Sequence, residues 1–302
     1  MVSLTVLLRA SDWFVDSAEE IGLSLGISPF IIGVTIVAFG TSLPELATSV
    51  ASVLDGHSEI VVSNVVGSNI TNIALVLGLV AVLVGRIEQE YNIWHIDMPY
   101  LWGSSFLMWF TLQDLNFSIF EAVLFLCGIV IFLSYSIKGS TDNNEDRERA
   151  SWRSYLFLVI GSVLVWLSAK YTIEAITHLS ELAGIAEELI ALSAVALGTS
   201  LPEVIVSLNA ARKGKTSIAI GNVLGSNIFN TYIVMSIPRF FGPLEIPVDI
   251  HSFYIPLMIA MTILFGIMTN NKKVTRWEGT VLLMFYVFFV GEMLRRALLS
   301  IG

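Results

Sequence analysis

The sequence predicts an all-α membrane protein with ten transmembrane helices arranged as two inverted five-helix repeats. The 302 residues are 55% hydrophobic and only 14% charged, whereas soluble domains carry roughly 25% charged residues. Apolar stretches of spanning length recur along the whole chain, which is typical of helical spans rather than the short alternating strands of a barrel. In addition, one hexapeptide that ends in glutamate occurs twice, each time inside such a stretch.

Ten stretches have the length and apolarity of spans. In order, they are Leu4–Leu25, Pro29–Leu54, Ile60–Val84, Trp94–Leu112, Phe117–Ile137, Tyr155–Leu179, Leu189–Ala211, Ile218–Phe241, Phe253–Met268 and Trp277–Leu299. The first is the most polar, because it carries four acids, and it is too polar to face lipid on all sides. Asp16 of this span aligns with Glu174 of the sixth, and the pair predicts a role at a helix end or an interface.

An internal repeat divides the chain. A shift of 158 positions aligns Gly33–Asn72 with Ala191–Asn230 without a gap, and 18 of these 40 positions are identical. We therefore expect a first five-helix repeat at 1–137, a linker at 138–153 and a second five-helix repeat at 154–302. The linker segment is the one clearly hydrophilic stretch. Five spans per half is an odd number, so the second copy should be inverted relative to the first.

The charges of the predicted loops agree with this inversion. Loops rich in Lys and Arg stay in the cytoplasm, and this rule places both termini outside the cell and the linker 138–153 inside. The acidic loop Asp55–Glu59 aligns with the basic loop Lys213–Ser217, as expected if the two lie on opposite sides of the membrane. Inverted repeats are typical of secondary transporters, whose substrate site lies at the midplane between the copies.

The repeated hexapeptide, Gly-Thr-Ser-Leu-Pro-Glu, occupies Gly40–Glu45 and Gly198–Glu203. Thr41 and Ser42 precede Glu45 by four and three positions, so the three side chains can share one helix face. The second copy predicts the same arrangement for Thr199, Ser200 and Glu203.

Proline in the hexapeptide opens the backbone. Pro44 has no amide hydrogen, so the carbonyl of Gly40 loses its helical partner, and carbonyls near Ala38 become free to face a cation. Exposed backbone is tolerated at membrane depth only where it lines a cavity. The second copy repeats this arrangement at Ala196, Gly198 and Pro202.

A second repeated motif, Gly-Ser-Asn followed three positions later by another Asn, supplies further oxygen ligands. Ser68 and Asn72 are four residues apart on one helix face, and Ser226 and Asn230 are their counterparts. Gly67 and Gly225 should allow close approach of a neighbouring helix, and the pattern Gly221-x-x-x-Gly225 is typical of helix packing. Carboxylate, hydroxyl, amide and carbonyl oxygens are the ligands of hard cations such as Ca²⁺ and Na⁺.

The cost of the buried charges separates a functional from a structural role. An uncompensated charge at mid-span costs about 3 kcal/mol. No Lys or Arg lies between Arg9 and Arg86 or between Lys170 and Arg212, so neither Glu45 nor Glu203 has a basic neighbour in sequence. The simplest counter-ion is an exchangeable cation, and two carboxylates balance one Ca²⁺. The structural alternative is a proline kink beside a protonated acid, with hydroxyls bonded to their own helix.

These motifs resemble those of the cation/calcium exchanger superfamily, and within it the prokaryotic sodium/calcium exchangers. The resemblance covers Gly26–Gly78 and Gly184–Ser236, and it implies exchange of about three Na⁺ for one Ca²⁺ at a site between the repeats. It also implies that the first and sixth spans slide as a gating pair. By position, Glu45 and Glu203 would bind Ca²⁺. The remaining Na⁺ and Ca²⁺ ligands would be Thr41, Ser42, Ser68, Asn72, Thr199, Ser200, Ser226, Asn230 and the carbonyls of Ala38 and Ala196.

Two departures bear on the coupling ion. Asn230 stands where some members, including potassium-dependent ones, carry Asp, and Gly-Ser-Asn replaces the motif of the proton-coupled branch. The expected function is thus Na⁺/Ca²⁺ antiport in the cell membrane, with these two ions as substrates and no cofactor. The alternatives are H⁺- or K⁺-coupled Ca²⁺ exchange and a passive cation channel. The net charge of −9 argues against nucleic acid as a partner, and no protein partner is evident. An intramembrane hydrolase finds little support, because Ser42 and Ser200 have no histidine base on a matching face.

Overall fold

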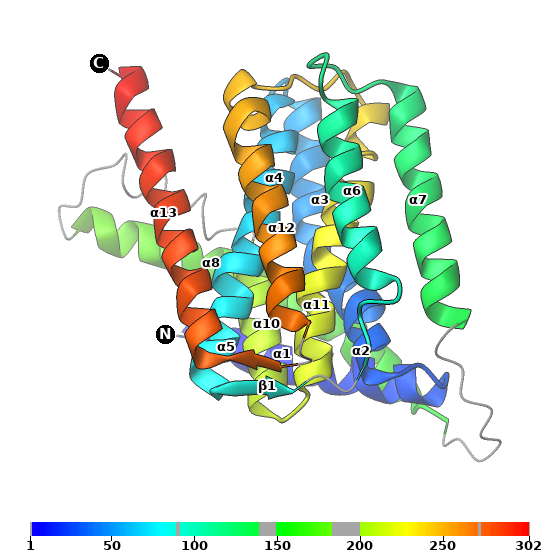
Figure 1. Ribbon diagram of the computed structural model, residues 1–302. Coiled ribbons are helices and arrows are strands. Elements are labelled where there is room, and N and C mark those ends of the chain that lie inside the picture. Colours follow the sequence, from blue (N-terminus) through cyan, green and yellow to red (C-terminus); the bar gives the residue numbers. More distant parts are fainter. Residues whose placement is uncertain (1, 89–90, 139–148, 183–199, 271–272, 302) are drawn as a thin grey trace.

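The protein is a bundle of long helices in a computed structural model that describes residues 2–88, 91–138, 149–182, 200–270 and 273–301. Figure 1 shows most of the helices side by side, with α1 and α8 running crosswise behind them. In the first half of the chain, the helices are α1 (Val2–Ser24), α2 (Pro29–Ile32), η1 (Gly33–Val37), α3 (Ala38–Leu54), α4 (Glu59–Thr71), η2 (Asn72–Leu77), α5 (Gly78–Val84), α6 (Asp97–Thr111) and α7 (Ile119–Lys138).

In the second half they are α8 (Trp152–Leu182), α10 (Leu201–Arg212), α11 (Thr216–Phe229), η3 (Asn230–Val234), η4 (Pro238–Phe240), η5 (Ile250–Tyr254), α12 (Ile255–Thr269) and α13 (Arg276–Ile301). Several of these elements run on without a break and together form one long helix, as α2, η1 and α3 do.

Seven of the described helices are long and apolar enough to cross a membrane. They are Pro29–Leu54, Glu59–Val84, Ile119–Ser136, Trp152–Leu179, Thr216–Phe240, Ile250–Thr269 and Arg276–Arg296. Three predicted spans are not among them. The helix α1 is rich in acids, α6 has only 15 residues, and Leu189–Ala211 lies partly outside the described residues. The all-helical membrane protein is therefore confirmed, while the ten spans and their inversion stay predictions.

One small sheet was not predicted. β1 (Arg86–Glu88) pairs with β2 (Lys273–Thr275) in antiparallel fashion, and Ile87 lies opposite Val274. Both of these side chains are buried, so the strand pair seals an end of the bundle where two interhelical loops meet. Three-residue strands leave too little alternation in the sequence to be recognised there.

π-helical turns interrupt the helices at repeat-related positions. η2 begins at Asn72 and η3 at Asn230, the two asparagines that the 158-residue shift aligns. A π-helical turn carries one residue more than an α-helical turn, and such turns occur frequently at functional sites. The sequence repeat thus has a counterpart in the local backbone geometry.

α11 lies at the centre of the bundle, where close packing depends on glycine. A Cβ atom at Gly225 would lie 2.3 Å from the carbonyl oxygen of Val34, and one at Gly221 would lie 2.3 Å from that of Phe30. On the facing helix, a Cβ at Gly33 would lie 2.4 Å from the carbonyl oxygen of Ile218. The predicted Gly-x-x-x-Gly packing is confirmed. For Gly67, a Cβ would meet no atom of the described residues within 4 Å, so its predicted contact stays a prediction.

Contacts between loops close the other end of the bundle. The Arg239 side chain donates hydrogen bonds to the backbone carbonyls of Phe117 and Gly242. The Ser58 hydroxyl accepts a hydrogen bond from the backbone amide of Glu245 at 3.1 Å. These contacts join loops of the first half of the chain to a loop of the second half.

Candidate ion-binding site

Two buried glutamates form the centre of the candidate site. Glu45 lies in α3 and Glu203 in the first turn of α10, and each is only 1% exposed. The two carboxyl groups are close enough to interact electrostatically. None of their four oxygens has a hydrogen-bond partner among the described residues, and no lysine or arginine of that part of the chain pairs with them. The sequence predicted two such unpaired acids, and the structure brings them together.

The Thr41 hydroxyl connects α3 with α11. It donates to Asn222 Oδ1 at 3.1 Å and lies 3.3 Å from the carbonyl oxygen of Ala38 and 3.4 Å from Ser226 Oγ. Thr41 also lies beside the Glu203 carboxyl group. One threonine of the first hexapeptide thus meets three predicted site residues, Ala38, Ser226 and Glu203.

The repeat-related asparagines Asn72 and Asn230 are fully buried, at 0% exposure each. Neither the oxygen nor the nitrogen of either amide has a partner in the described residues. The turn η2, which begins at Asn72, packs against α10, and η3 packs against α3. Buried polar groups without partners cost about 1–3 kcal/mol each, so this cluster of amides and carboxyls is suited to a ligand that supplies the missing contacts.

The remaining predicted serines are also buried. Ser68 is 3% exposed and lies 3.5 Å from Asn64 Oδ1, and Ser200 is 2% exposed at the start of α10. Ser226 is fully buried. Ala196, Gly198 and Thr199 lie outside the described residues, so their predicted roles stay predictions.

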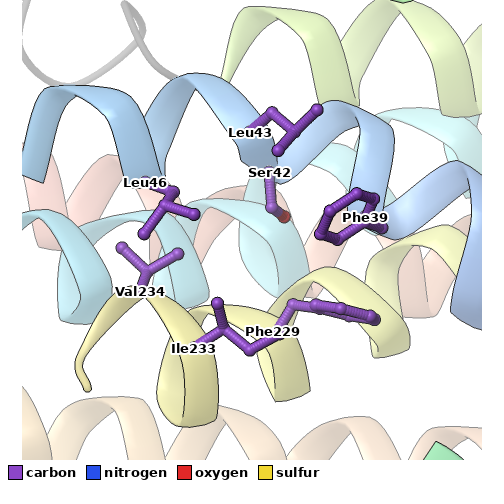
Figure 2. Close-up of a pocket in the computed structure, with 7 residues that line it drawn as sticks. All are labelled: Phe39, Ser42, Leu43, Leu46, Phe229, Ile233 and Val234. Carbon is purple, nitrogen blue, oxygen red and sulfur yellow. The ribbon is translucent and has the colours of Figure 1, made fainter. Parts of the chain in front are cut away.

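Ser42 lies in a small pocket at the edge of the site (Figure 2). The lining side chains come from α3 and from the junction of α11 and η3, and apart from Ser42 they are apolar. The Ser42 hydroxyl is buried and has no partner among the described residues. Phe39 and Phe229 flank it, with ring centroids 5.7 Å apart. Phe39 and Leu43 are 46% and 40% exposed, so the pocket lies just inside the outer surface of the helices.

Sequence reasoning missed four polar residues beside the site. Asn64 Nδ2 donates to Ser49 Oγ at 3.0 Å, and Asn222 Nδ2 donates to Ser207 Oγ at 2.9 Å. The 158-residue shift aligns both pairs, so the same hydrogen bond is built twice. Their identity in the two copies was a usable signal, but an identical residue shows its role only when its neighbour is known.

The donor set fits a hard cation. Two carboxyl groups, two hydroxyls at Thr41 and Ser226, and two asparagine amides offer oxygen atoms only, apart from the amide nitrogens. Such a set favours Ca²⁺ and Na⁺ over transition metals, which select imidazole or thiolate. Because the carboxyl groups have no basic partner, a cation entering between them would neutralise charge that the described part of the protein leaves uncompensated.

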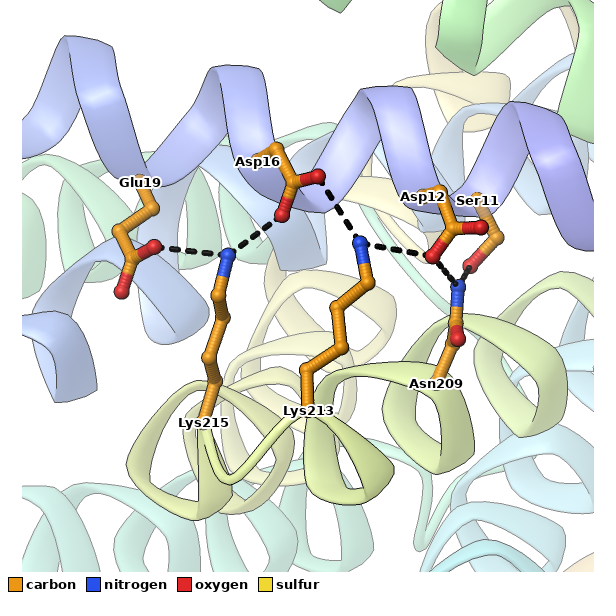
Figure 3. A network of polar contacts seen from close by, with 7 residues as sticks. All are labelled: Ser11, Asp12, Asp16, Glu19, Asn209, Lys213 and Lys215. Carbon is orange, nitrogen blue, oxygen red and sulfur yellow. Dashed lines mark hydrogen bonds and ion pairs between the residues drawn. The ribbon is translucent and has the colours of Figure 1, made fainter.

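The acids of α1 form a separate polar network (Figure 3). Lys213 contacts Asp12 at 2.7 Å and Asp16 at 2.8 Å, and Lys215 contacts Asp16 and Glu19. Burial lowers the pKa of Lys215, but hydrogen bonds to the two acids outweigh it, so the net pKa is raised. Its ion pairs are therefore present at neutral pH and are lost only as the pH rises through that raised value. The predicted interface role of Asp16 is confirmed, whereas the one ion pair of Glu174 within the described ranges joins it to Lys170 of its own helix, at 3.9 Å.

Removing both lysines should loosen α1. In the double variant Lys213→Gln with Lys215→Gln, α1 loses its ion pairs to the α10–α11 loop, so its backbone amides should exchange hydrogen faster. Hydrogen–deuterium exchange measured by mass spectrometry checks this, with α3 and α11 expected to keep their native rates. Lys170→Gln is the matched control, because the ion pair of Lys170 that the structure describes is a long one, to Glu174 of the same helix. Native exchange rates in α1 of the double variant would show that the network does not hold this helix.

Comparison with known proteins agrees with this site. The family described as "Sodium/calcium exchanger protein" matches residues 1–138 and 153–294. Sodium/calcium exchanger MaX1 of Methanosarcina acetivorans is 34% identical over a gapped alignment of 337 positions that covers 96% of each chain. Putative antiporter CaxA of Alkalimonas amylolytica is 32% identical, with 95% of each chain covered.

A solved structure shows the same fold. The sodium-calcium exchanger NCX_Mj, soaked with Na⁺ and Sr²⁺, superimposes with a TM-score of 0.84 at 30% identity, covering 96% of this chain and 95% of that one. The family match thus spans nearly the whole sequence, including both glutamates and both Gly-Ser-Asn motifs. The chain belongs to the sodium/calcium exchanger protein family, whose members are multi-pass membrane antiporters.

Proposed function

We propose that this protein is a secondary active antiporter that exchanges Na⁺ for Ca²⁺ across the cell membrane by alternating access. One observation carries the proposal: Glu45 and Glu203 are both buried, interact with each other and have no basic partner among the described residues. A site of this kind needs cations to balance it, so it favours reorientation only when ions are bound. The names of MaX1 and NCX_Mj as sodium/calcium exchangers support Na⁺ as the counter-ion.

The charge of the site supports electrogenic exchange. Two ionised glutamates carry −2, which one Ca²⁺ neutralises. A load of about three Na⁺ would leave the site with one positive charge, so each cycle would move net charge across the membrane. Asn230 contributes an uncharged amide to the site, and this composition favours Na⁺ alone over coupling that also needs K⁺.

The proposed ligand set divides by chemistry. Glu45 and Glu203 bind Ca²⁺ directly, and neutral oxygens complete the Na⁺ and Ca²⁺ sites. The neutral ligands are the side chains of Thr41, Ser42, Ser68, Asn72, Thr199, Ser200, Ser226 and Asn230 and the carbonyls of Ala38 and Ala196. No cofactor enters the proposal, and the only partners are the two ions and the lipid bilayer.

The proposed membrane arrangement follows the internal repeat. Residues 1–137 and 154–302 each form five spans of opposite orientation, with both termini outside and the linker 138–153 in the cytoplasm. Labelling of single cysteines at His57 and Ser151 by a membrane-impermeant reagent distinguishes the two sides, with only the former labelled from outside. Labelling of both from the same side would contradict the inversion.

An ion-flux measurement tests the coupling. Purified protein in vesicles should take up ⁴⁵Ca²⁺ when an outward Na⁺ gradient is imposed, and it should take up little with H⁺ or K⁺ as the opposing gradient. Uptake should also respond to membrane potential, since net charge moves. Uptake driven by H⁺ or K⁺ instead would assign the alternative coupling. Continuous Ca²⁺ current without any counter-ion would indicate a passive channel.

A further inference from the structure

A chain of buried hydrogen bonds leads from α10 through α11 to the first hexapeptide. Asn222 Nδ2 donates to Ser207 Oγ at 2.9 Å, and Thr41 donates to Asn222 Oδ1 at 3.1 Å. Ser207 and Asn222 are fully buried, and Thr41 is 1% exposed. Because Thr41 lies beside Glu203, this chain ends at the centre of the site. Asn222 itself is not among the predicted ion ligands.

The hydroxyl of Thr41 can serve a cation only if its proton points elsewhere. A hydroxyl has one proton and two lone pairs, and a cation near Glu203 would repel the proton and attract the lone pairs. Apart from the Glu203 carboxyl group, Thr41 Oγ1 has three neighbours in the described part of the chain that can take the proton: Asn222 Oδ1 at 3.1 Å, the Ala38 carbonyl at 3.3 Å and Ser226 Oγ at 3.4 Å. Asn222 is the nearest of them. A bond to Asn222 also leaves both the Ala38 carbonyl and the Ser226 hydroxyl, which are predicted ligands, available to the ion.

The orientation of the Asn222 amide is supported by its counterpart in the other repeat. Asn64 Nδ2 donates both to Ser49 Oγ and, at 3.2 Å, to the backbone carbonyl of Glu45. A carbonyl can only accept, so the NH₂ group of Asn64 must face α3. The aligned Asn222 then turns its NH₂ group toward Ser207 in the same way and leaves its oxygen for Thr41. A flipped amide would instead donate to Thr41 and occupy the lone pair that an ion needs.

We propose that Asn222 is a positioning residue that accepts the proton of the Thr41 hydroxyl, so that the Thr41 oxygen presents its lone pairs to the bound cation. The inference rests on the proposed function, since it assumes that Thr41 is an ion ligand. Ser207 fixes the amide, the amide fixes the hydroxyl, and the hydroxyl meets the ion. Residues of the second repeat thereby orient a ligand that belongs to the first. The 158-residue shift aligns Asn64 with Asn222.

A double-mutant cycle tests the proposal. Asn222→Leu keeps the approximate shape of the side chain but removes the acceptor. We expect the Ca²⁺ concentration that gives half-maximal uptake, or half of the Ca²⁺-dependent rise in Tm, to increase about tenfold, which corresponds to the loss of one buried hydrogen bond. Thr41→Val should raise it tenfold or more. The double variant should match Thr41→Val alone, because Asn222 acts only through that hydroxyl. In a Thr41→Ser background, which keeps the hydroxyl, Asn222→Leu should retain its full effect.

Two readouts separate failure of this inference from failure of the proposed function. Na⁺-driven ⁴⁵Ca²⁺ uptake reports transport, and the Ca²⁺-dependent rise in Tm reports binding whether or not transport occurs. Absence of Na⁺-driven uptake in the native protein would refute the proposed function, and the cycle would then be read from Tm alone. Two results would overturn the role of Asn222. One is a half-maximal Ca²⁺ concentration in the double variant that has increased by the product of the two single effects. The other is an unchanged Ca²⁺ response in Asn222→Leu.

Asn69→Leu is the matched control. Asn69 is also a buried asparagine that donates to a threonine, here Thr231 Oγ1 at 3.0 Å, but its bond does not lead to Thr41. Asn69→Leu should lower Tm, and its effect on the Ca²⁺ response should be independent of that of Thr41→Val. If Asn222→Leu does not fold, Ser207→Ala takes its place in the cycle, since it removes the acceptor that orients the amide. Coupling of Ser207→Ala to Thr41→Val supports the proposal, and independent effects overturn it.

Discussion

Glutamine in place of Glu45 or Glu203 is expected to abolish Na⁺-driven Ca²⁺ uptake while the protein still folds. Each substitution removes one of the two charges that a Ca²⁺ ion would meet in the site. Loss of one partner of a buried ion pair costs roughly 3 kcal/mol or more, which is over a hundredfold in affinity. Folding should not suffer, because the lost carboxylate has no partner among the described residues and its burial was itself unfavourable.

Two measurements on the purified variants check this expectation. ⁴⁵Ca²⁺ uptake into vesicles should fall to the level of empty vesicles. The Tm in ion-free buffer should equal or exceed the native value, and added Ca²⁺ should no longer raise it. Glu59→Gln is the control, because Glu59 is a partly exposed acid at the start of α4 whose partner is His57. Normal exchange in either glutamine variant would refute the site.

Alanine at Gly225 is expected to be the most destabilising single-methyl addition in the bundle. Its Cβ would lie 2.3 Å from the Val34 carbonyl oxygen and 2.7 Å from the Ala38 Cβ. Both are parts of a packed helix that cannot rotate away, so α11 and η1 must move apart. Overpacking typically costs about 1–3 kcal/mol and occasionally more, and contact with backbone at this distance places Gly225→Ala at the upper end. Because Ala38 and Thr41 follow η1 directly, the same displacement should also impair Ca²⁺ binding.

The Tm and the yield of folded protein check this prediction. Gly103→Ala makes the same chemical change on an exposed face of α6, where a Cβ would meet no described atom within 4 Å, and it should leave Tm unchanged or slightly raised. A native Tm for Gly225→Ala would mean that the seam between α11 and η1 is looser than these distances imply.

The central residues of the candidate site could be predicted because the internal repeat places the same motifs in both halves of the chain. The hexapeptide, the Gly-Ser-Asn motif and the lack of basic neighbours sufficed to select Glu45, Glu203, Thr41 and Asn230, and the structure places these residues in adjoining elements. Asn222 and Ser207 were equally visible as repeated identities. Their role depends on which side chain of another helix lies opposite, and a periodic pattern does not contain that information.

Other features depend on tertiary contacts in the same way. The acids of α1 were recognised as too polar for lipid, but their lysine partners lie about two hundred positions further along the chain. The π-helical turns at Asn72 and Asn230 result from packing that selects an extra residue per turn, and no composition signal marks them. The three-residue strands β1 and β2 form only because two distant loops meet.

The strand pair β1–β2 also restricts how the chain crosses the bilayer. Its two strands share one face of the membrane, so the chain must traverse the bilayer an even number of times between Glu88 and Lys273. Four of the seven long apolar helices lie in that interval. If each of them traverses once, any further crossings in that interval must be even in number.

The hydrogen bond from Arg239 to the Phe117 carbonyl adds a second parity condition. Three of the long apolar helices separate these residues, and three is odd. If each of them traverses once and the two residues lie on one side of the membrane, the interval between them needs one further crossing. The two contacts, at opposite ends of the bundle, thus set parity conditions on the crossings, while the count of ten spans stays a prediction.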